Sequence, residues 1–246
     1  MADHPSLEAY EELDSTNAEA RRRAEAGEAG PVWITAARQT AGRGRRGRPW
    51  STGEGNLAAT LLTVTDAAPA EAAQVSFVAA LAAADLVDTC LGPDVARLKW
   101  PNDVLVHGGK AVGILVESGP RADGRLWLAV GVGVNLAHHP HDVERPATSL
   151  AEHMAGRAPQ PREALEILAA RFEVWRRLWE AQGFAAVAAA WTRRAHGLGE
   201  ACAAHLPGRT LKGVAEGLEP DGALRLRLDD GAVERITAGD VFFGGA

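Results

Sequence analysis

The segment between residues 69 and 89 is the feature that most restricts how this chain folds. Its sequence is P-A-E-A-A-Q-V-S-F-V-A-A-L-A-A-A-D-L-V-D-T, and over much of its length apolar residues occupy every side of the expected helix. A helix that is apolar all round is normally buried by other elements. The pattern therefore predicts a long helix packed against the core, in a chain of 246 residues that suffices for one large domain or a large and a small one.

Shorter patterns on both sides of this segment predict a sheet. Strands are expected at 32–37, 56–64 and 126–136, where apolar residues are bounded by turn residues. The run V-L-V, H-G-G-K, A-V-G-I-L-V-E indicates a hairpin that turns at 107–110. Glycines alternate along 126–136, which is typical of a strand that a ligand or another backbone approaches closely.

Two further helical regions are predicted. Thr16 and Glu19 have the spacing of a capping box, so a first helix is expected from this point until Gly27 stops it. Residues 161–195 carry apolar positions at helical spacing together with many arginines. The tryptophans of this region are expected in the core, in preference to a binding platform: Trp175, Trp179 and Trp191.

The pattern of the chain changes after Glu200. Short alternating segments are separated there by L-P-G, E-P-D-G, D-D-G and A-G-D, which is typical of a small all-β barrel or sandwich. We therefore expect a boundary near residues 197–199, with one domain at 1–197 and a second at 198–246.

Charge and composition exclude several classes of protein. A net charge of -6 argues against a general nucleic-acid or membrane-surface binder, so any polyanion has to be bound locally. The N-terminus has neither the basic start nor the apolar core of a signal peptide, and no apolar run approaches about 18 residues. Cys90 and Cys202 lie far apart without metal-ligand spacing, so we expect two buried, unbridged thiols in a cytoplasmic protein.

The segment R-Q-T-A-G-R-G-R-R-G-R-P-W at residues 38–50 is unfavourable for folding alone. It places four like charges among flexible glycines, which costs both electrostatic repulsion and backbone entropy. An anionic ligand would relieve the repulsion, and such a loop can bind phosphates through backbone N–H groups and arginine side chains. A solvated basic linker or a nucleic-acid patch is the alternative. A dinucleotide fingerprint is disfavoured because Pro49 interrupts the segment and no helix follows directly.

Lysine and asparagine are rare in this chain and gather in a few places. Of the 26 basic side chains only three are lysines, and two of these, Lys99 and Lys110, lie in one short segment. Where arginine would serve, this sequence uses arginine, so a retained lysine suggests a need for a compact ammonium group. The polar clusters are D-S-T-N (14–17), Q-T-A-G-R-G-R-R-G-R-P-W (39–50), K-W-P-N-D (99–103), G-K-A-V-G-I-L-V-E (109–117) and G-V-G-V-N (131–135).

Taken singly, these clusters also have simple structural explanations. D-S-T-N is a common helix N-cap, K-W-P-N-D suits a turn, and Lys110 suits the end of a hairpin. In this order and spacing, however, they resemble the motifs of the biotin protein ligases, which attach biotin to a lysine of biotin-dependent carboxylases. The motifs S-T-N, G-R-G-R-R-G-R-x-W, K-W-P-N-D and G-K-x-x-G-I-L-V-E carry the resemblance, which extends over nearly the whole chain.

The resemblance implies an α+β fold. Its first part would be a mixed central β-sheet with flanking helices, the class II synthetase-like catalytic domain of biotin and lipoate ligases. A small C-terminal SH3-like β-barrel would follow. The implied reaction is ATP-dependent activation of biotin to biotinyl-5'-AMP, followed by transfer of the biotinyl group to a lysine of a biotin carboxyl carrier domain. Biotin and ATP with Mg2+ would be the substrates, without a tightly bound prosthetic group.

The chemistry and the resemblance together assign the candidate residues. Lys110 is expected to bridge the biotin carboxylate and the α-phosphate, and with Arg45 forms the catalytic pair. The expected biotin-binding residues are Ser15, Thr16, Asn17, Gln39, Arg43, Gly44, Arg45, Lys110 and Gly113. The expected ATP- and adenylate-binding residues are Arg43, Arg45, Arg48, Trp50, Asn102, Asp103, Lys110 and Asn135. Whether Asn102 and Asp103 position Lys110 or the metal ion is left open by the sequence.

Other functions remain possible at this stage. A lipoate or octanoate ligase or transferase would share the fold, although such an enzyme is expected to have a long apolar channel and to lack G-R-G-R-R-G. A non-enzymatic module could instead use the arginine loop to hold RNA. Only fourteen residues precede Ser15, too few for a DNA-binding helix-turn-helix module, so no DNA binding is expected. Neither a membrane partner nor a particular state, monomer or homodimer, is indicated.

Overall fold

A seven-stranded sheet organises the first part of the computed structural model, which describes residues 5–141 and 146–244. Its strand order is β1-β2-β3-β7-β6-β5-β4. The strands are β1 (Ser6–Leu13), β2 (Val32–Gln39), β3 (Leu57–Thr65), β4 (Ala96–Lys99), β5 (Asp103–Val106), β6 (Gly109–Pro120) and β7 (Leu126–Val134). β1 and β2 are parallel, whereas the other neighbours are antiparallel. The expected mixed central sheet is therefore confirmed.

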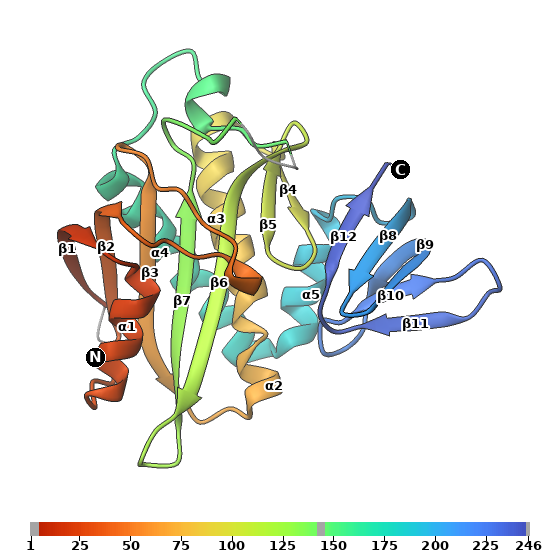
Figure 1. Ribbon diagram of the computed structural model, residues 1–246, viewed down its shortest axis with the longest axis horizontal. Coiled ribbons are helices and arrows are strands. Elements are labelled where there is room, and N and C mark those ends of the chain that lie inside the picture. Colours follow the sequence, from red (N-terminus) through yellow and green to blue (C-terminus); the bar gives the residue numbers. More distant parts are fainter. Residues whose placement is uncertain (1–4, 142–145, 245–246) are drawn as a thin grey trace.

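Helices that cover one face of this sheet form the main core (Figure 1). The region predicted as one helix at 69–89 is two helices, α2 (Pro69–Ala72) and α3 (Val75–Leu91), joined by a short turn. α3 is buried on nearly all sides because the sheet lies on one side and α4 (Pro161–Gln182) on another. α5 (Phe184–Arg193) follows after Gly183, whose φ of 72° breaks the predicted 161–195 helix in two.

The core position predicted for the tryptophans is confirmed. Trp191 is 1% exposed, and Trp175 and Trp179 pack partly buried against the same core. Cys202 is buried, but Cys90 is only partly so, and both are free thiols. The stretch Pro69–Leu91 is apolar and long enough to span a membrane by composition, with a mean hydropathy of 1.5. A buried core helix has the same composition, and 61% of the 18 residues that give this hydropathy is buried inside the protein.

The opposite face of the sheet carries α1 (Thr16–Glu25) and is otherwise open to the chain segment that follows β2 (Figure 1). Ala20 and Ala24 of α1 pack on β2, β3 and β7 in a small second core. The predicted capping box is wrong: Ser15 is the N-cap and makes no side-chain cap bond, while Glu19 pairs with Arg22. α1 therefore begins at the expected place for a different reason, and the Thr16 hydroxyl is left available for contacts with β2 and β3.

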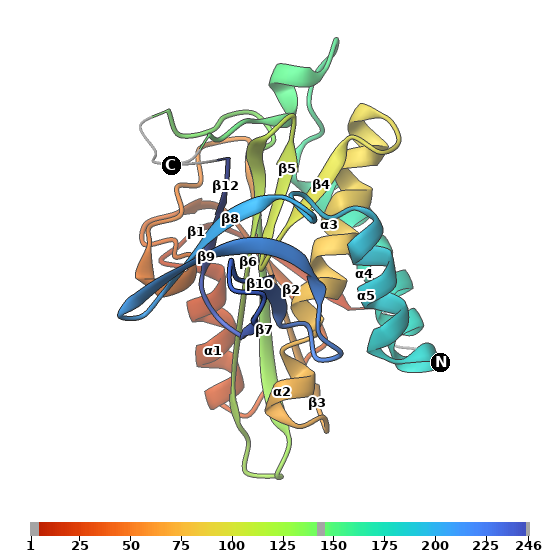
Figure 2. The ribbon, with the colours of Figure 1, turned by 90° about the vertical axis from the view of Figure 1, so that its right-hand side faces the viewer.

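The second sheet is antiparallel and is formed by the C-terminal residues, which lie beyond the β4 side of the first sheet (Figures 1 and 2). Its strands are β8 (Ala201–Leu206), β9 (Arg209–Leu218), β10 (Leu224–Arg227), β11 (Val233–Ile236) and β12 (Asp240–Phe243), in the order β11-β10-β9-β8-β12. The separate C-terminal β unit is thus as expected. The predicted domain boundary at 197–198 falls between the end of α5 and the start of β8.

Direct contacts fix this second sheet to the first. The backbone of Leu98 in β4 donates to Arg194 O at 2.8 Å and accepts from His196 N at 2.8 Å, so the connection after α5 runs alongside the edge strand. The Trp100 indole N–H also donates to Gly222 O at 3.1 Å. The tryptophan of the K-W-P-N-D motif therefore joins the two sheets.

Candidate active site

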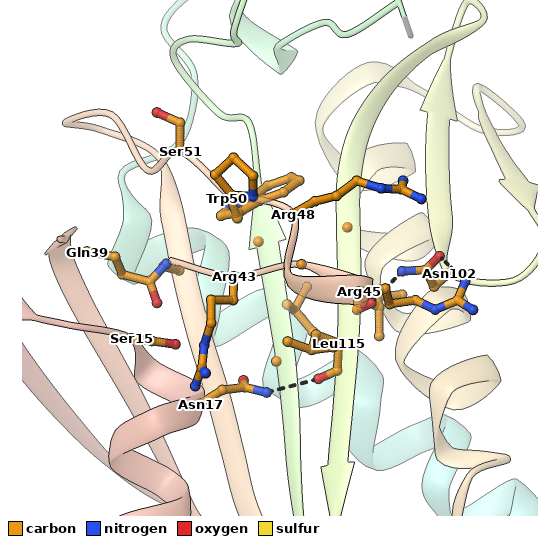
Figure 3. A pocket seen from close by; sticks show the side chains of 18 of the residues that line it. Ser15, Asn17, Gln39, Arg43, Arg45, Arg48, Trp50, Ser51, Asn102 and Leu115 are labelled. Atoms are coloured by element: carbon orange, nitrogen blue, oxygen red, sulfur yellow. Dashed lines mark hydrogen bonds between the residues drawn. The ribbon is translucent and has the colours of Figure 1, made fainter. Parts of the chain in front are cut away.

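The segment between β2 and β3 crosses the open face of the first sheet and covers a cavity of about 380 Å³ (Figures 1 and 3). We call residues 42–48 of this segment the arginine loop. Every predicted site residue lines the cavity: Ser15, Thr16, Asn17, Gln39, Arg43, Gly44, Arg45, Arg48, Trp50, Asn102, Asp103, Lys110, Gly113 and Asn135. The fold thus brings together residues from five separate sequence clusters, although the role of each one stays a prediction.

One side of the cavity is a network of hydroxyl and amide groups at the start of α1. Thr16 N and Oγ1 donate to Gln39 Oε1 at 2.8 and 3.2 Å. The buried Thr60 hydroxyl of β3 is 2.8 Å from Thr16 Oγ1 and 2.7 Å from Asn17 Oδ1. Because these groups hold one another in place, their donors and acceptors point in fixed directions toward any polar ligand in the cavity.

Thr60 is absent from the predicted site residues. The signal available in the sequence was a polar residue within the apolar run L-A-A-T-L-L-T-V. The structure shows that its side chain is completely buried. A buried hydroxyl requires a hydrogen-bond partner, and here that requirement is met by two residues of the site.

A glycine on β7 allows Asn17 to lie against the sheet. The Asn17 amide donates to Glu117 Oε2 at 2.8 Å and to Leu115 O at 3.3 Å (Figure 3). A Cβ atom at Gly131 would lie 2.2 Å from Asn17 Oδ1, which no side chain at that position could accommodate without displacing the amide. This contact explains the first of the alternating glycines in G-V-G-V-N.

A pair of glycines on neighbouring strands supports the Trp50 ring. Gly113 of β6 and Gly133 of β7 are in register. A Cβ at Gly113 would lie 2.8 Å from the ring, and one at Gly133 only 2.4 Å from it. The indole therefore rests directly on the sheet backbone at the cavity.

Lys110 is held by a buried carboxylate. Its Nζ lies 2.5 Å from Asp103 Oδ1, and the Asp103 side chain is 6% exposed whereas that of Lys110 is 27% exposed. The same Nζ lies 5.4 Å from the centroid of the Trp50 ring, within the range of a cation–π contact. Asp103 thus forms an ion pair with the ammonium group, and its role in the reaction stays a prediction.

Asn135 and Asn102 each use an amide group to hold backbone near Lys110. Asn135 Nδ2 donates to Thr148 O at 3.0 Å and to Lys110 O at 3.3 Å. Asn102 Nδ2 donates to Ile114 O at 2.6 Å, while its Oδ1 accepts from Arg45 Nη1 at 3.3 Å. Both side chains therefore support the cavity walls, and both also line the cavity.

The arginine loop is a compact turn. Gly44 N donates to Arg48 O at 2.7 Å, Arg43 and Pro49 form an antiparallel bridge, and Trp50 N donates to Gly42 O at 2.9 Å. Between them lies a single 3-10 turn in which Arg46 has a left-handed φ of 57°.

The arginine side chains of the loop point in different directions. Figure 3 shows Arg43 directed toward Ser15 and Asn17, on the side of the cavity away from Arg45 and Asn102. Arg43 thus lies beside the hydroxyl and amide network in this structure, and its expected contacts with biotin and ATP stay predictions. Arg45 also donates to Gly239 O at 3.4 Å, and burial lowers the pKa of its guanidinium, an effect that the nearby Asp240 opposes.

Asp240 lines the cavity and is the second residue that sequence reasoning missed. It is the first residue of β12, in the C-terminal sheet, and its side chain is only 11% exposed. Its Oδ2 accepts from Arg46 Nη1 at 2.9 Å and also from Arg48 Nη2. In the sequence it is one acidic residue in a turn-and-strand pattern, and nothing local distinguishes it.

Known proteins resemble this chain over nearly its whole length. Residues 11–135 match the biotin/lipoate A/B protein ligase family, and residues 197–244 match the biotin protein ligase C-terminal domain. The chain is 45% identical over 238 residues to a biotin--[acetyl-CoA-carboxylase] ligase of Paracoccus denitrificans, covering 94% of this chain and 98% of the relative. The chain belongs to the biotin protein ligase family. It is accordingly an enzyme, and the resemblance noted in its motifs is confirmed.

Solved structures of biotin protein ligases have the same fold. The Aquifex aeolicus enzyme in complex with biotin and ATP superimposes with a TM-score of 0.80 at 26% identity, covering 98% of this chain and 99% of that one. The Leishmania major enzyme in complex with biotinyl-5-AMP gives 0.67 at 26% identity, covering 95% and 99%. Both comparisons extend over the two sheets, so the C-terminal sheet is part of the shared architecture.

Acidic and metal-binding residues are sparse near the cavity of this biotin ligase. Within residues 5–141 and 146–244, no group of three or more His, Cys, Asp or Glu side chains is arranged to hold a metal ion. The two carboxylates that line the cavity, Asp103 and Asp240, both pair with cationic side chains.

Proposed function

We propose that this biotin ligase activates biotin with ATP to biotinyl-5'-AMP and then transfers the biotinyl group to a lysine of a biotin carboxyl carrier domain. One observation carries the proposal: a single cavity is lined by a fixed amide and hydroxyl network, by a lysine held in place, and by arginines on a covering loop. The solved complexes of two relatives with biotin and ATP, and with biotinyl-5-AMP, support it.

The first chemical step needs positive charge close to the reacting atoms. A carboxylate is a poor electrophile, so its oxygen attacks the α-phosphorus of ATP, the bond to the bridging oxygen breaks, and pyrophosphate leaves with the electron pair. Lys110 would stabilise this step because it is a compact cation, fixed by Asp103, that can lie between carboxylate and α-phosphate. Arg45, beside Asn102, would neutralise phosphate charge.

The polar network at α1 suits the ureido ring of biotin. The ring carries two N–H donors and a carbonyl acceptor, and Ser15, Thr16 and Gln39 offer hydroxyl and amide groups that match such a ligand. Trp50 would cover the apolar part of the bound molecule, because its ring already forms a wall of the cavity. Exclusion of water by this wall and the arginine loop would protect an adenylate that hydrolyses readily.

The second step needs no nucleophile from this chain. The deprotonated amine of the carrier lysine attacks the acyl carbon of biotinyl-5'-AMP, a new amide bond forms, and AMP leaves. The task of the protein is then to hold the adenylate with its acyl carbon accessible.

Mg2+ would reach the site as part of the substrate, bound to the phosphates of ATP. This ion prefers a few carboxylate ligands together with phosphate oxygens and water. Both carboxylates of the cavity pair with cationic side chains, so the phosphates and water would supply most of the ligands of this ion.

Pyrophosphate exchange tests the proposal directly. Purified protein is incubated with ATP, Mg2+ and labelled pyrophosphate, together with biotin, lipoate or octanoate in parallel reactions. We expect exchange with biotin to exceed that with the other acids by roughly two orders of magnitude, because an apolar chain would leave the amide and hydroxyl network unpaired. Transfer is then measured as biotin on an added carrier domain. Equal exchange with lipoate and biotin would refute the proposed selectivity for biotin.

A further inference from the structure

Asp240 belongs to the C-terminal sheet but lies in the wall of the cavity, below the arginine loop. Its carboxylate is shared by two guanidinium groups, those of Arg46 and Arg48. The preceding residue, Gly239, accepts from Arg45 through its carbonyl. Three of the four loop arginines thus contact the two residues at the start of β12, which lie about 190 positions further along the chain.

We propose that Asp240 is a positioning residue that docks the arginine loop over the cavity, with Arg46 and Arg48 as its partners. The inference deepens the proposed function and rests on it only in assigning this cavity to biotin and ATP. It divides the arginines into two sets. Arg46 and Arg48 fasten the loop to the C-terminal sheet through the Asp240 carboxylate, while Arg45, which reaches that sheet only through a 3.4 Å bond to a carbonyl, would contact the substrates.

The backbone of the loop supports this division. Arg46 adopts a left-handed φ of 57°, which a non-glycine residue holds only when its surroundings compensate for the strain. Among the described residues, the polar contact found for its side chain is the one with Asp240. Of the four loop arginines, Arg43, Arg45 and Arg48 line the cavity, whereas Arg46 does not. The left-handed backbone of Arg46 therefore places its side chain against Asp240 of β12.

Charge also favours this arrangement. Four arginines in seven residues repel one another, and a carboxylate that is 11% exposed lies at short range from two of them and offsets one of the positive charges. Charge-assisted hydrogen bonds of this kind are the stronger class of protein hydrogen bond. The repulsion is therefore relieved in part before any phosphate arrives, so the loop is docked by the protein itself and not by substrate alone.

Strand β12 is packed firmly at its other end, at Phe243. His196 packs edge-on against Phe243, with the ring centroids 5.3 Å apart. A Cβ at Gly197 would lie 2.4 Å from the same phenyl ring, which shows how tightly β12 contacts the connection after α5. That connection is hydrogen-bonded to Leu98 of the first sheet, so Asp240 is fixed relative to the cavity.

The test compares Asp240→Asn and Arg46→Ala, singly and together, with Asp240→Glu as the conservative variant. The matched control is Glu234→Gln, which removes another carboxylate of the C-terminal sheet that pairs with an arginine, Arg209, at 3.5 Å near the surface. Hydrogen exchange of the peptide that contains residues 42–50 is measured in the full-length protein without substrates, and thermal unfolding shows that each variant is folded.

We expect exchange in that peptide to become about tenfold faster in Asp240→Asn and in Arg46→Ala. The double variant should be no more than about twofold faster than Asp240→Asn alone, because both changes remove the same contact. Asp240→Glu should retain most of the protection, and Glu234→Gln should match the parent. Unchanged protection in both single variants, or additive effects in the double variant, would overturn the proposal.

Activity assays separate this inference from the proposed function. With biotin and ATP, Asp240→Asn should raise the KM for ATP several-fold more than it lowers kcat, and should release more free adenylate. A parent protein that exchanges no pyrophosphate refutes the proposed function but not the docking of the loop. The inference alone is refuted if the parent exchanges pyrophosphate and Asp240→Asn has the same KM for ATP, the same adenylate release and the same loop protection as the parent.

Discussion

Replacement of Gly133 by alanine should inactivate the enzyme while leaving it folded. The added Cβ would lie 2.4 Å from the Trp50 ring, whereas ordinary contacts begin at 3.4 Å, so the ring has to move by about 1 Å. A displacement of that size at an active site can cost about 10²-fold in rate. Movement of the ring also weakens its cation–π contact with Lys110, worth about 0.5–2 kcal/mol. We therefore expect kcat/KM for biotin-dependent exchange to fall about 10²-fold.

Stability should change little in this variant. Gly133 has no left-handed backbone, and alanine restricts the unfolded chain by about 0.4–1 kcal/mol in favour of the native state. Trp50 is only partly buried, so its ring can move outward at modest cost. The melting temperature should therefore remain within a few degrees of the parent's.

Three variants provide the assay and its control. Pyrophosphate exchange is measured for Gly133→Ala, Trp50→Ala and the double variant, with Gly156→Ala as the control because a Cβ there meets nothing within 4 Å. If the alanine acts by displacing the ring, the double variant should be as active as Trp50→Ala within about twofold. Full activity of Gly133→Ala, or a double variant far worse than Trp50→Ala, would refute the reasoning.

Three further results are expected. Lys110→Arg should lose about 10²-fold or more of biotin-dependent exchange, because a guanidinium cannot replace the ammonium group held by Asp103. The control, Lys212→Arg on the exposed surface of β9, should match the parent. Equal rates for Lys110→Arg and the parent would contradict this prediction. Arg45→Gly should keep its melting temperature yet label lysines of bystander proteins with biotin, and a variant that labels only the carrier would count against the arginine as a barrier to adenylate loss. Duplex DNA of any sequence should bind weakly at physiological salt, given the net charge of -6, and a sequence-specific gel shift would show the opposite.

The sequence predicted much of the fold because its signals are local. Gly27 stops α1, the H-G-G-K turn joins β5 to β6, and alternating patterns after Glu200 form the second sheet. Strand β1 (Ser6–Leu13) was not foreseen. Its exposed edge position and its glutamates give it little apolar pattern, and it is defined by parallel pairing with β2. The break at Gly183 was also missed, because helical spacing continues through it.

The candidate site was predictable only for residues that stand in recognisable clusters. Lys110 and Gln39 belong to such clusters, and the fold brings them to one cavity. Asp240 could not be found in this way, since its partner Arg48 is 192 positions away and the contact exists only through the packing of β12. Contacts made by tertiary structure alone leave no local pattern in the chain.

The contacts between the two sheets determine whether the C-terminal sheet of one relative could replace that of another. The C-terminal strands form one contiguous segment, which suggests a part that could be cut at the linker and replaced. However, Leu98 is bonded to the linker backbone, the Trp100 indole to a turn of the second sheet, and two loop arginines to Asp240. A chimera that joins this first sheet to the C-terminal sheet of another protein would therefore need an acidic residue at the start of the last strand and a backbone carbonyl opposite Trp100. The two sheets are accordingly expected to change together in evolution.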